Sequence, residues 1–329
     1  MVSNQSPAHT SDWTRHSSIA PDGLELALYE YQYSPNTTPT DRPVFLLIHG
    51  LGQNQLAYSR GPLPRILAER GAKVFIGELR DHGSSERSLT GQHAPTNLST
   101  LLNFDLPTLI RQTCELSEVE RVHYVGHSMG GILGYALLQS NHRIASLTTL
   151  AAPVYLGSDR PVLRSTARLA QPFLKRLPSS RIPLDVILRH LASVVSAPTN
   201  RRPWNKLNSL WRLGHPDAAD REILKEILRN AHSLPKSLLL DCVELATGGT
   251  SQIGSVRLSR AIDRATQPIA AVVAQDDIFA GPRSVQPIMN GTKLRRIVVL
   301  PRSGHIDITL GRYSEYILEQ VWSMLTTEA

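Results

Sequence analysis

The sequence has few cysteines, few aromatic residues and no long apolar run. Two cysteines, Cys114 and Cys242, among 329 residues exclude a framework of disulfide bonds, and we expect both to be small buried side chains. No stretch reaches the roughly 18 apolar residues that cross a bilayer. The first residues, MVSNQSPAHTSDWTR, lack the apolar run of a secretory signal. We therefore expect a soluble, cytoplasmic protein without a transmembrane segment.

What the sequence does have is a regular alternation of two patterns. Short continuous apolar runs are typical of strands buried on both faces of a sheet. Between them lie helical patterns, and a hairpin with a turn at Pro21-Asp22-Gly23 precedes them. This alternation predicts an α/β fold with a mostly parallel, doubly wound sheet. The expected strands cover 44–50, 73–79, 121–126, 146–153, 268–275 and 294–301, and the expected helices cover 63–71, 104–119, 130–141 and 312–325.

The alternation stops over 154–267, and this segment also differs in charge. The whole chain carries +7, but Asp159 to Lys236 holds fifteen lysines and arginines against six aspartates and glutamates, so the rest is slightly acidic. Within it, DREILKEILRN has an apolar stripe at helical spacing. The sequence therefore predicts a discontinuous α/β core, 1–153 and 268–329, with a helical, basic cap of 154–267 inserted after the sixth strand.

VGHSMGG, residues 125–131, places Ser128 between two glycines at the end of an expected strand and the start of an expected helix. A sharp strand-to-helix turn exposes a side chain but needs small neighbours, here Gly126 and Gly130. A chance G-x-S-x-G is the alternative. The position at the carboxyl end of a central strand, where open α/β sheets bind ligands, favours a nucleophile that needs a base.

Five segments in order resemble motifs of the α/β-hydrolase superfamily, over nearly the whole chain. They are LLIHGLGQ (oxyanion loop), ELRDHGSSE (the D-x-R-G-x-G-x-S segment, from which Glu78 and Asp81 depart), GHSMGG (nucleophile elbow), VVAQDDIFAGP (acid loop) and LPRSGHIDITLG (histidine loop). With serine at the nucleophile position, the sequence resembles the serine hydrolase branch of the superfamily, since its dehalogenases and epoxide hydrolases use aspartate there. APVYLG and GHID are loosely similar to acid lipases and polyester synthases, but the synthases commonly use cysteine.

The resemblance implies a catalytic triad in the chain order serine, acid, histidine. Ser128 is then the nucleophile, and His305, in a loop after an expected strand, is the general base. Asp277 fits the family's acid position, while its neighbour Asp276 remains the alternative. Asp307 is expected to start a helix instead.

Attack on a carbonyl also needs two fixed amide donors for the oxyanion. The amide of Met129 follows the nucleophile at a helix N-terminus, where the helix dipole assists it. By resemblance the amide of Leu51 supplies the second donor. We expect His49, His82 and His127 to pack or to brace these loops.

These residues predict a serine hydrolase that cleaves a carboxylic ester, or a related small acyl compound, through an acyl-enzyme on Ser128. The basic segment leaves open a thioesterase or acyltransferase that acts on coenzyme A or carrier-bound acyl groups. A non-catalytic binding protein with this fold is the third hypothesis. We expect no cofactor, no metal and no nucleic-acid partner, because the sequence has no Walker loop, no G-x-G-x-x-G after a strand and no metal-ligand cluster.

Overall fold

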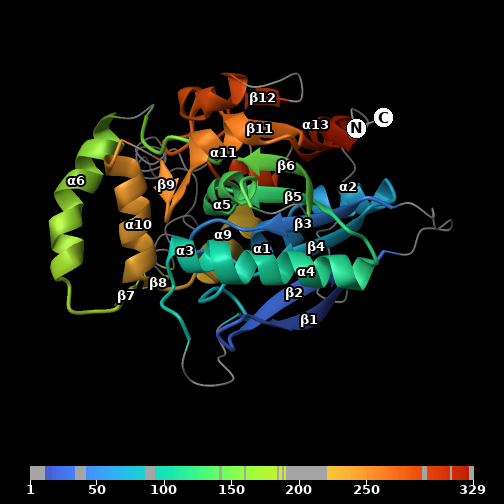
Figure 1. Ribbon diagram of the computed structural model, residues 1–329, viewed down its shortest axis with the longest axis horizontal. Helices are drawn as coiled ribbons and strands as arrows, with labels where there is room; N and C mark the ends of the chain where they lie inside the picture. Colours follow the sequence, from blue (N-terminus) through green and yellow to red (C-terminus); the bar gives the residue numbers. More distant parts are fainter. Residues whose placement is uncertain are drawn as a thin grey trace.

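A twisted sheet of eight strands runs through the centre of the protein (Figure 1). The computed structural model describes residues 12–33, 42–85, 93–140, 143–158, 161–183, 185–186, 189, 221–249, 251–290, 295–311 and 313–325. In spatial order the strands are β1 (Trp13–Ile19), β2 (Glu25–Tyr31), β4 (Lys73–Gly77), β3 (Val44–Ile48), β5 (Val122–His127), β6 (Ile144–Leu150), β11 (Ile269–Ala274) and β12 (Arg295–Leu300).

The direction of these strands confirms the expected sheet. β1 and β2 form the antiparallel hairpin, and β2 pairs antiparallel with β4. Every pair from β4 across to β12 is parallel. The carboxyl ends of β3, β5, β11 and β12 therefore lie at one edge of the sheet, so loops from distant parts of the chain meet there.

Helices cover both faces because successive strand residues point to opposite sides. In β3, Leu46 and Ile48 join one apolar cluster while Phe45 and Leu47 join the other. The first cluster includes α4 (Leu106–Ser117), α5 (Met129–Leu137) and α11 (Leu258–Arg264). The second includes α1 (Leu56–Ser59), α2 (Leu63–Glu69), α12 (Asp307–Leu310) and α13 (Ser314–Leu325). The fold is doubly wound, as the sequence predicts.

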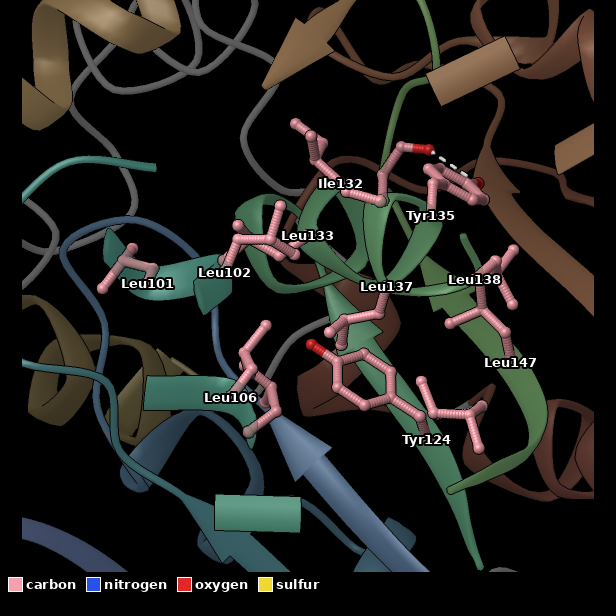
Figure 2. Packing of buried hydrophobic residues seen from close by; sticks show 14 of the residues in the cluster. Leu101, Leu102, Leu106, Tyr124, Ile132, Leu133, Tyr135, Leu137, Leu138 and Leu147 are labelled. Atoms are coloured by element: carbon pink, nitrogen blue, oxygen red, sulfur yellow. Dashed lines mark hydrogen bonds between the residues drawn. The ribbon is translucent and has the colours of Figure 1, made fainter. Parts of the chain in front are cut away.

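Helix α5, which follows Ser128, is apolar all round and fully buried. In Figure 2, Leu133 and Leu137 of α5 point toward Leu102 and Leu106, with Tyr124 of β5 beside them. Burial of each such leucine contributes roughly 1.5–3 kcal/mol. The Tyr124 hydroxyl donates to the carbonyl oxygen of Gly130 (2.7 Å), which ties the first turn of α5 to β5. The helix behind the serine is thus rigidly held.

The helix expected over 104–119 begins earlier than its apolar pattern indicates. α3 (Leu98–Thr100) and a π-helical turn, η2 (Leu101–Asp105), lead directly into α4. The Asn97 side chain accepts a hydrogen bond from the Thr100 amide (2.8 Å), which is a standard helix N-cap. The signal for this start, TNLST, was present in the sequence ahead of the periodic stretch.

The chain between β6 and β11 is mainly helical where it is described. α6 (Pro161–Arg176) and α10 (Lys236–Thr247) lie side by side, away from the sheet (Figure 1). The amphipathic stretch at 220–230 forms α9 (Arg221–Arg229), and short strands β7 (Arg181–Ile182) and β8 (Leu234–Pro235) pair antiparallel. Two more strands of two residues each, β9 (Gln252–Ile253) and β10 (Val256–Arg257), also pair antiparallel. Most of the expected cap between 184 and 220 lies outside the described residues.

None of the helices in the described ranges is both long and apolar enough to cross a membrane.

Candidate active site

Ser128 sits in a sharp turn between β5 and α5. Its backbone has φ +50° and ψ −117°, a region that non-glycine residues rarely occupy, at a cost of order 1–3 kcal/mol. A Cβ on Gly126 would lie 2.5 Å from the Gly130 carbonyl carbon, and a Cβ on Gly130 would lie 2.5 Å from the Ile48 oxygen. Only glycines permit this close approach, so the turn lifts the half-buried serine above the sheet edge.

The structure brings Ser128, His305 and Asp277 into one hydrogen-bonded line. His305 Nε2 lies 2.9 Å from Ser128 Oγ, and His305 Nδ1 lies 2.7 Å from Asp277 Oδ2. Asp277 is fully buried, and its Oδ1 accepts the Phe279 amide hydrogen at 2.7 Å. The Phe279 ring packs edge-on against His305 with centroids 5.0 Å apart. Oδ1 of Asp277 is therefore occupied by the Phe279 amide and Oδ2 contacts the imidazole, while the Phe279 ring restricts rotation of the imidazole.

Asp276 and Asp277 differ in position. Asp276 is half-buried and its backbone amide donates to the Ser303 carbonyl oxygen at 3.0 Å. It is the side chain of Asp277 that reaches His305. Asp307 starts α12 as expected, but its carboxylate accepts the amide hydrogen of Gly304, ahead of the helix, at 2.7 Å. That bond holds the loop that carries His305.

Two backbone amides near Ser128, one in the next residue and one in the loop after β3, make no hydrogen bond in the described part of the chain. They are the amides of Met129 and Leu51. The loop of Leu51 lies against the serine, since a Cβ on Gly50 would be 3.0 Å from Ser128 Cβ. The Met129 amide is at the N-terminus of α5, where the helix dipole favours negative charge, and the Leu51 amide lies in the loop after β3.

Two buried histidines brace this loop, as expected. His49 accepts the Leu79 amide hydrogen at Nε2 (3.2 Å), so its Nδ1–H donates to the Gly50 carbonyl oxygen (2.8 Å). His82 accepts the Gly52 amide hydrogen at Nε2 (3.2 Å) and donates from Nδ1 to the Arg80 carbonyl oxygen (2.8 Å). Burial lowers the pKa of His82 to about 4 and that of His49 well below its ordinary value, so both rings are neutral at pH 7.

A third buried histidine, His127, touches two of the loops at once. Its Nδ1 lies 2.8 Å from Gln53 Oε1, and its Nε2 lies 3.1 Å from the His305 carbonyl oxygen. Burial, together with the nearby His305 ring, lowers the pKa of His127 to about 3. Gln53 ends the segment LLIHGLGQ, but the sequence did not indicate its contact with His127, because the two residues lie 74 positions apart along the chain.

Buried charges support the segment after β4. The guanidinium of Arg80 is fully buried and pairs with Asp105 and Asp22, both at 2.7 Å. Glu78, a departure from the family's aspartate, accepts the amide hydrogens of Gln55 (2.8 Å) and Ser84 (2.7 Å), and burial raises the pKa of its carboxyl group. These bonds fix the loops after β3 and β4 relative to each other.

Asp81, the second departure, stands where the family's pattern has glycine. Its φ is +59°, the left-handed region that glycine adopts freely and aspartate tolerates. Its carboxylate pairs with Arg181 of β7 at 2.7 Å and accepts from the Thr96 hydroxyl. Although burial opposes the charged form, these hydrogen bonds lower the pKa of Asp81. A side chain thus joins the core to the segment after β6 at a position where glycine offers none.

Other contacts join the same two regions. The Asn54 amide group donates to the Asn230 carbonyl oxygen (3.0 Å), and the Gly83 amide donates to His232 Nε2 (3.1 Å). An ion pair of 2.6 Å joins Arg60, after α1, to Glu226 of α9. None of these long-range pairs has a local signal in the sequence.

Metal binding finds no support in the part of the chain that is described: no group of three or more His, Cys, Asp or Glu side chains there could hold a metal ion.

Comparisons with known proteins agree with this geometry. A family model described as the alpha/beta hydrolase fold matches residues 43–181. The gastric triacylglycerol lipase of Rattus norvegicus is 27% identical over 140 residues, which make up 39% of this chain and 35% of the lipase. Lipase 3 of Drosophila melanogaster is 28% identical over 177 residues, 48% of this chain and 44% of that lipase. The aligned regions span less than half the length of these curated relatives.

Solved structures extend the likeness of fold over almost the whole chain. A monoglyceride lipase from Saccharomyces cerevisiae superposes with a TM-score of 0.64 at 16% identity, covering 98% of this chain and 96% of its own. A thermophilic esterase from Thermogutta terrifontis gives a TM-score of 0.63 at 18% identity, covering 94% and 99%. The strand order and the solved structures show that the chain has the α/β-hydrolase fold, residues 43–181 match the model of that family, and the curated relatives add a lipase-like similarity of sequence.

Proposed function

We propose that this protein is a serine hydrolase that cleaves a carboxylic ester through an acyl-enzyme formed on Ser128. The observation that carries the proposal is the line of contacts from Ser128 Oγ to His305 Nε2 (2.9 Å) and from His305 Nδ1 to Asp277 Oδ2 (2.7 Å). A serine hydroxyl is a weak nucleophile until a base accepts its proton, and this line provides the base and its orienting acid.

Each member of the line has one role. The Asp277 carboxylate holds the proton of neutral His305 on Nδ1, which leaves the Nε2 lone pair facing the serine hydroxyl. His305 accepts the hydroxyl proton as Ser128 attacks the ester carbonyl, and it returns that proton to the leaving alcohol. A water molecule, activated by His305 in the same way, then releases the acid from Ser128.

The free amides of Leu51 and Met129 are the proposed oxyanion donors. Preorganised donors stabilise the tetrahedral intermediate because they need no reorientation as its charge develops. Loss of one such donor lowers kcat by about 10²–10³, or about 3 kcal/mol. Both donors are backbone groups, so the side chains of Leu51 and Met129 are free to contact the acyl group.

We further propose that residues 154–267 form a cap on a discontinuous core of 1–153 and 268–329. The support is the set of polar contacts between the two, such as Asp81 with Arg181 and Arg60 with Glu226. These contacts lie on the loops after β3 and β4, next to the proposed oxyanion loop. A cap at this place would select the acyl group while the core supplies the chemistry.

The substrate class follows from the relatives and the nucleophile. The curated relatives are named triacylglycerol lipases and lipases, and structural neighbours include monoglyceride lipases and esterases. We propose a small acyl ester as the substrate, with glycerol esters as the first class to assay. A series of p-nitrophenyl esters from acetate to palmitate, beside monoacylglycerols, measures the preferred chain length.

Replacing Ser128 by alanine tests the proposal. We expect Ser128→Ala to abolish turnover of p-nitrophenyl butyrate, because no other group on the line can form the acyl-enzyme, and to leave the melting temperature within a few degrees. A fluorophosphonate probe should label the wild-type chain at Ser128 and leave the variant unlabelled. Undiminished turnover, or no labelling of the wild type, refutes the proposal; the latter result favours a non-catalytic binding protein.

The charge of the cap favours a second candidate, a thioesterase or acyltransferase acting on coenzyme A or carrier-bound acyl groups. Arg168, Lys175 and Arg176 are exposed on α6, a helix with no acidic residue. Anionic groups on such a substrate would be attracted to this surface. Reversal of these three charges should raise KM for a coenzyme A ester and spare a neutral ester, whereas equal effects on both substrates exclude this candidate.

A further inference from the structure

The loop that carries Leu51 and the loop that carries His305 are joined through one buried side chain, His127. The Gly50 amide donates to Gln53 Oε1 (2.9 Å), and the same oxygen lies 2.8 Å from His127 Nδ1. On the other side of the ring, Nε2 lies 3.1 Å from the His305 carbonyl oxygen. The connection therefore passes from the β3 loop, through the residue before the nucleophile, to the β12 loop.

Counting protons shows that this connection is unusual. The Gly50 N–H requires that the atom facing His127 be the oxygen of Gln53, and a backbone carbonyl is also an acceptor only. Both ring nitrogens of His127 thus face acceptors, but a neutral imidazole has one N–H to donate. A cationic ring would satisfy both, yet it would be fully buried with its centroid 5.0 Å from that of His305. Burial and this neighbour keep the ring neutral.

We propose that His127 and Gln53 are positioning residues that hold the oxyanion loop in register with His305. This proposal rests on the proposed function. The proton of His127 resides on Nδ1 and is donated to Gln53 Oε1, the shorter of its two contacts. Gln53 then fixes Gly50, and Gly50 precedes the Leu51 amide. Neither side chain takes part in the chemical step.

The consequence for turnover is specific. Displacement of a catalytic group by about 1 Å can cost 10²-fold in rate, and the oxyanion donors act mainly in the transition state. A cut in the His127–Gln53 link should therefore lower kcat and leave KM nearly unchanged. A purely structural role would instead lower the melting temperature with little effect on kcat of the folded protein.

Two replacements of His127 separate the halves of the link. An asparagine amide reaches the place of Nδ1 and preserves donation to Gln53, whereas a glutamine amide reaches the place of Nε2 and does not. We expect a fall in kcat of tenfold or more for Gln53→Leu and for His127→Gln, a smaller fall for His127→Asn, and KM within threefold for all. The double variant Gln53→Leu/His127→Gln should have the same kcat as the less active of the two single variants, because each substitution breaks the same link.

His123→Gln is the matched control, since His123 lies on the same strand and its described contacts, Ser146 Oγ (2.9 Å) and the Phe45 ring (centroids 5.2 Å apart), are not part of the His127–Gln53 link. It should alter kcat by less than twofold. The tether is refuted if Gln53→Leu and His127→Gln keep kcat within twofold of the wild type, if KM rises instead, or if the losses multiply in the double variant.

A measurement without substrate keeps the test independent of catalysis. In protein labelled with ¹⁵N-histidine, the ring nitrogens of His127, assigned by their loss in His127→Gln or His127→Asn, should report a neutral ring protonated on Nδ1. In Gln53→Leu the proton should move to Nε2, where the His305 carbonyl accepts it. A ring already protonated on Nε2 in the wild type overturns the proposal. Absence of serine-dependent turnover in the wild type refutes the proposed function alone.

Discussion

Replacement of Asp277 by asparagine should convert His305 from a base into a donor. Oδ1 of Asp277 accepts the Phe279 amide hydrogen, so the asparagine oxygen must occupy that place. The asparagine NH₂ group would then face His305 Nδ1 at the position of Oδ2, 2.7 Å away. To accept from it, the imidazole must carry its proton on Nε2, where it would donate to Ser128 instead of accepting.

This change of tautomer sets the magnitude. In a serine–histidine–aspartate site the wrong tautomer lowers kcat by about 10⁴, or about 5 kcal/mol. Because asparagine has nearly the volume of aspartate, the site should keep its shape, and KM for p-nitrophenyl butyrate should change little. Initial rates between pH 6 and 10 measure kcat. Active-site titration by a fluorophosphonate gives the concentration of active enzyme, so that inactive protein does not lower the value.

The neighbouring carboxylate provides the control. Asp276→Asn makes the same chemical change one residue earlier and should alter kcat by less than twofold, because it is Asp277 that lies 2.7 Å from His305 Nδ1. Retention of more than a tenth of the wild-type kcat by Asp277→Asn contradicts the reasoning. So does a result in which Asp276→Asn is the variant that fails.

Three further predictions concern the scaffold. Gly130→Ala places a methyl group 2.5 Å from the Ile48 oxygen, so it should destabilise the fold by about 1–3 kcal/mol or more and lower kcat; unchanged melting and activity would contradict the close approach. Asp105→Asn leaves buried Arg80 short of one charged partner and should lower the free energy of unfolding in urea by about 3 kcal/mol; a loss below about 1 kcal/mol would mean that Asp22 suffices. Burial lowers the pKa of His123 to about 4, whereas in the unfolded chain this histidine takes up a proton below about pH 6.5, so the free energy of unfolding should fall by about 2 kcal/mol between pH 7 and pH 5. His123→Gln should remove that part of the pH dependence, and an identical pH profile for the variant argues against this reasoning.

The parts of the site that were predictable are those with a local pattern. Ser128 is marked by glycines within two residues, and His305 and Asp277 each follow a short apolar run at a sheet edge. Buried strands appear in the sequence as short continuous apolar runs, so the order of strands and helices was also predictable. The start of the helical stretch at Leu98 was not found by its apolar period, because a cap, Asn97, and not periodicity marks it.

The parts that escaped prediction depend on partners far apart in sequence. Gln53 meets His127 across 74 residues and Arg181 meets Asp81 across 100, and neither pair has a spacing that a motif could capture. The second departure from the family pattern, Asp81, could be noted in the sequence but not explained. Its explanation needed the left-handed backbone of Asp81 and the contact with Arg181 of β7, which only the folded chain brings together.

The place of β11 in the sheet has a practical consequence. Ser128, Leu51 and Met129 come from the first part of the chain, whereas Asp277 and His305 come from the last part, and β11 joins them by pairing with β6. A chain cut between Ile182 and Arg221 would thus yield two fragments, one with the proposed nucleophile and one with its proposed acid and base. Under the proposed function neither fragment would turn over an ester alone. The pairing of β6 with β11 would then be the junction of a split reporter, in which hydrolysis signals that the two fragments have associated.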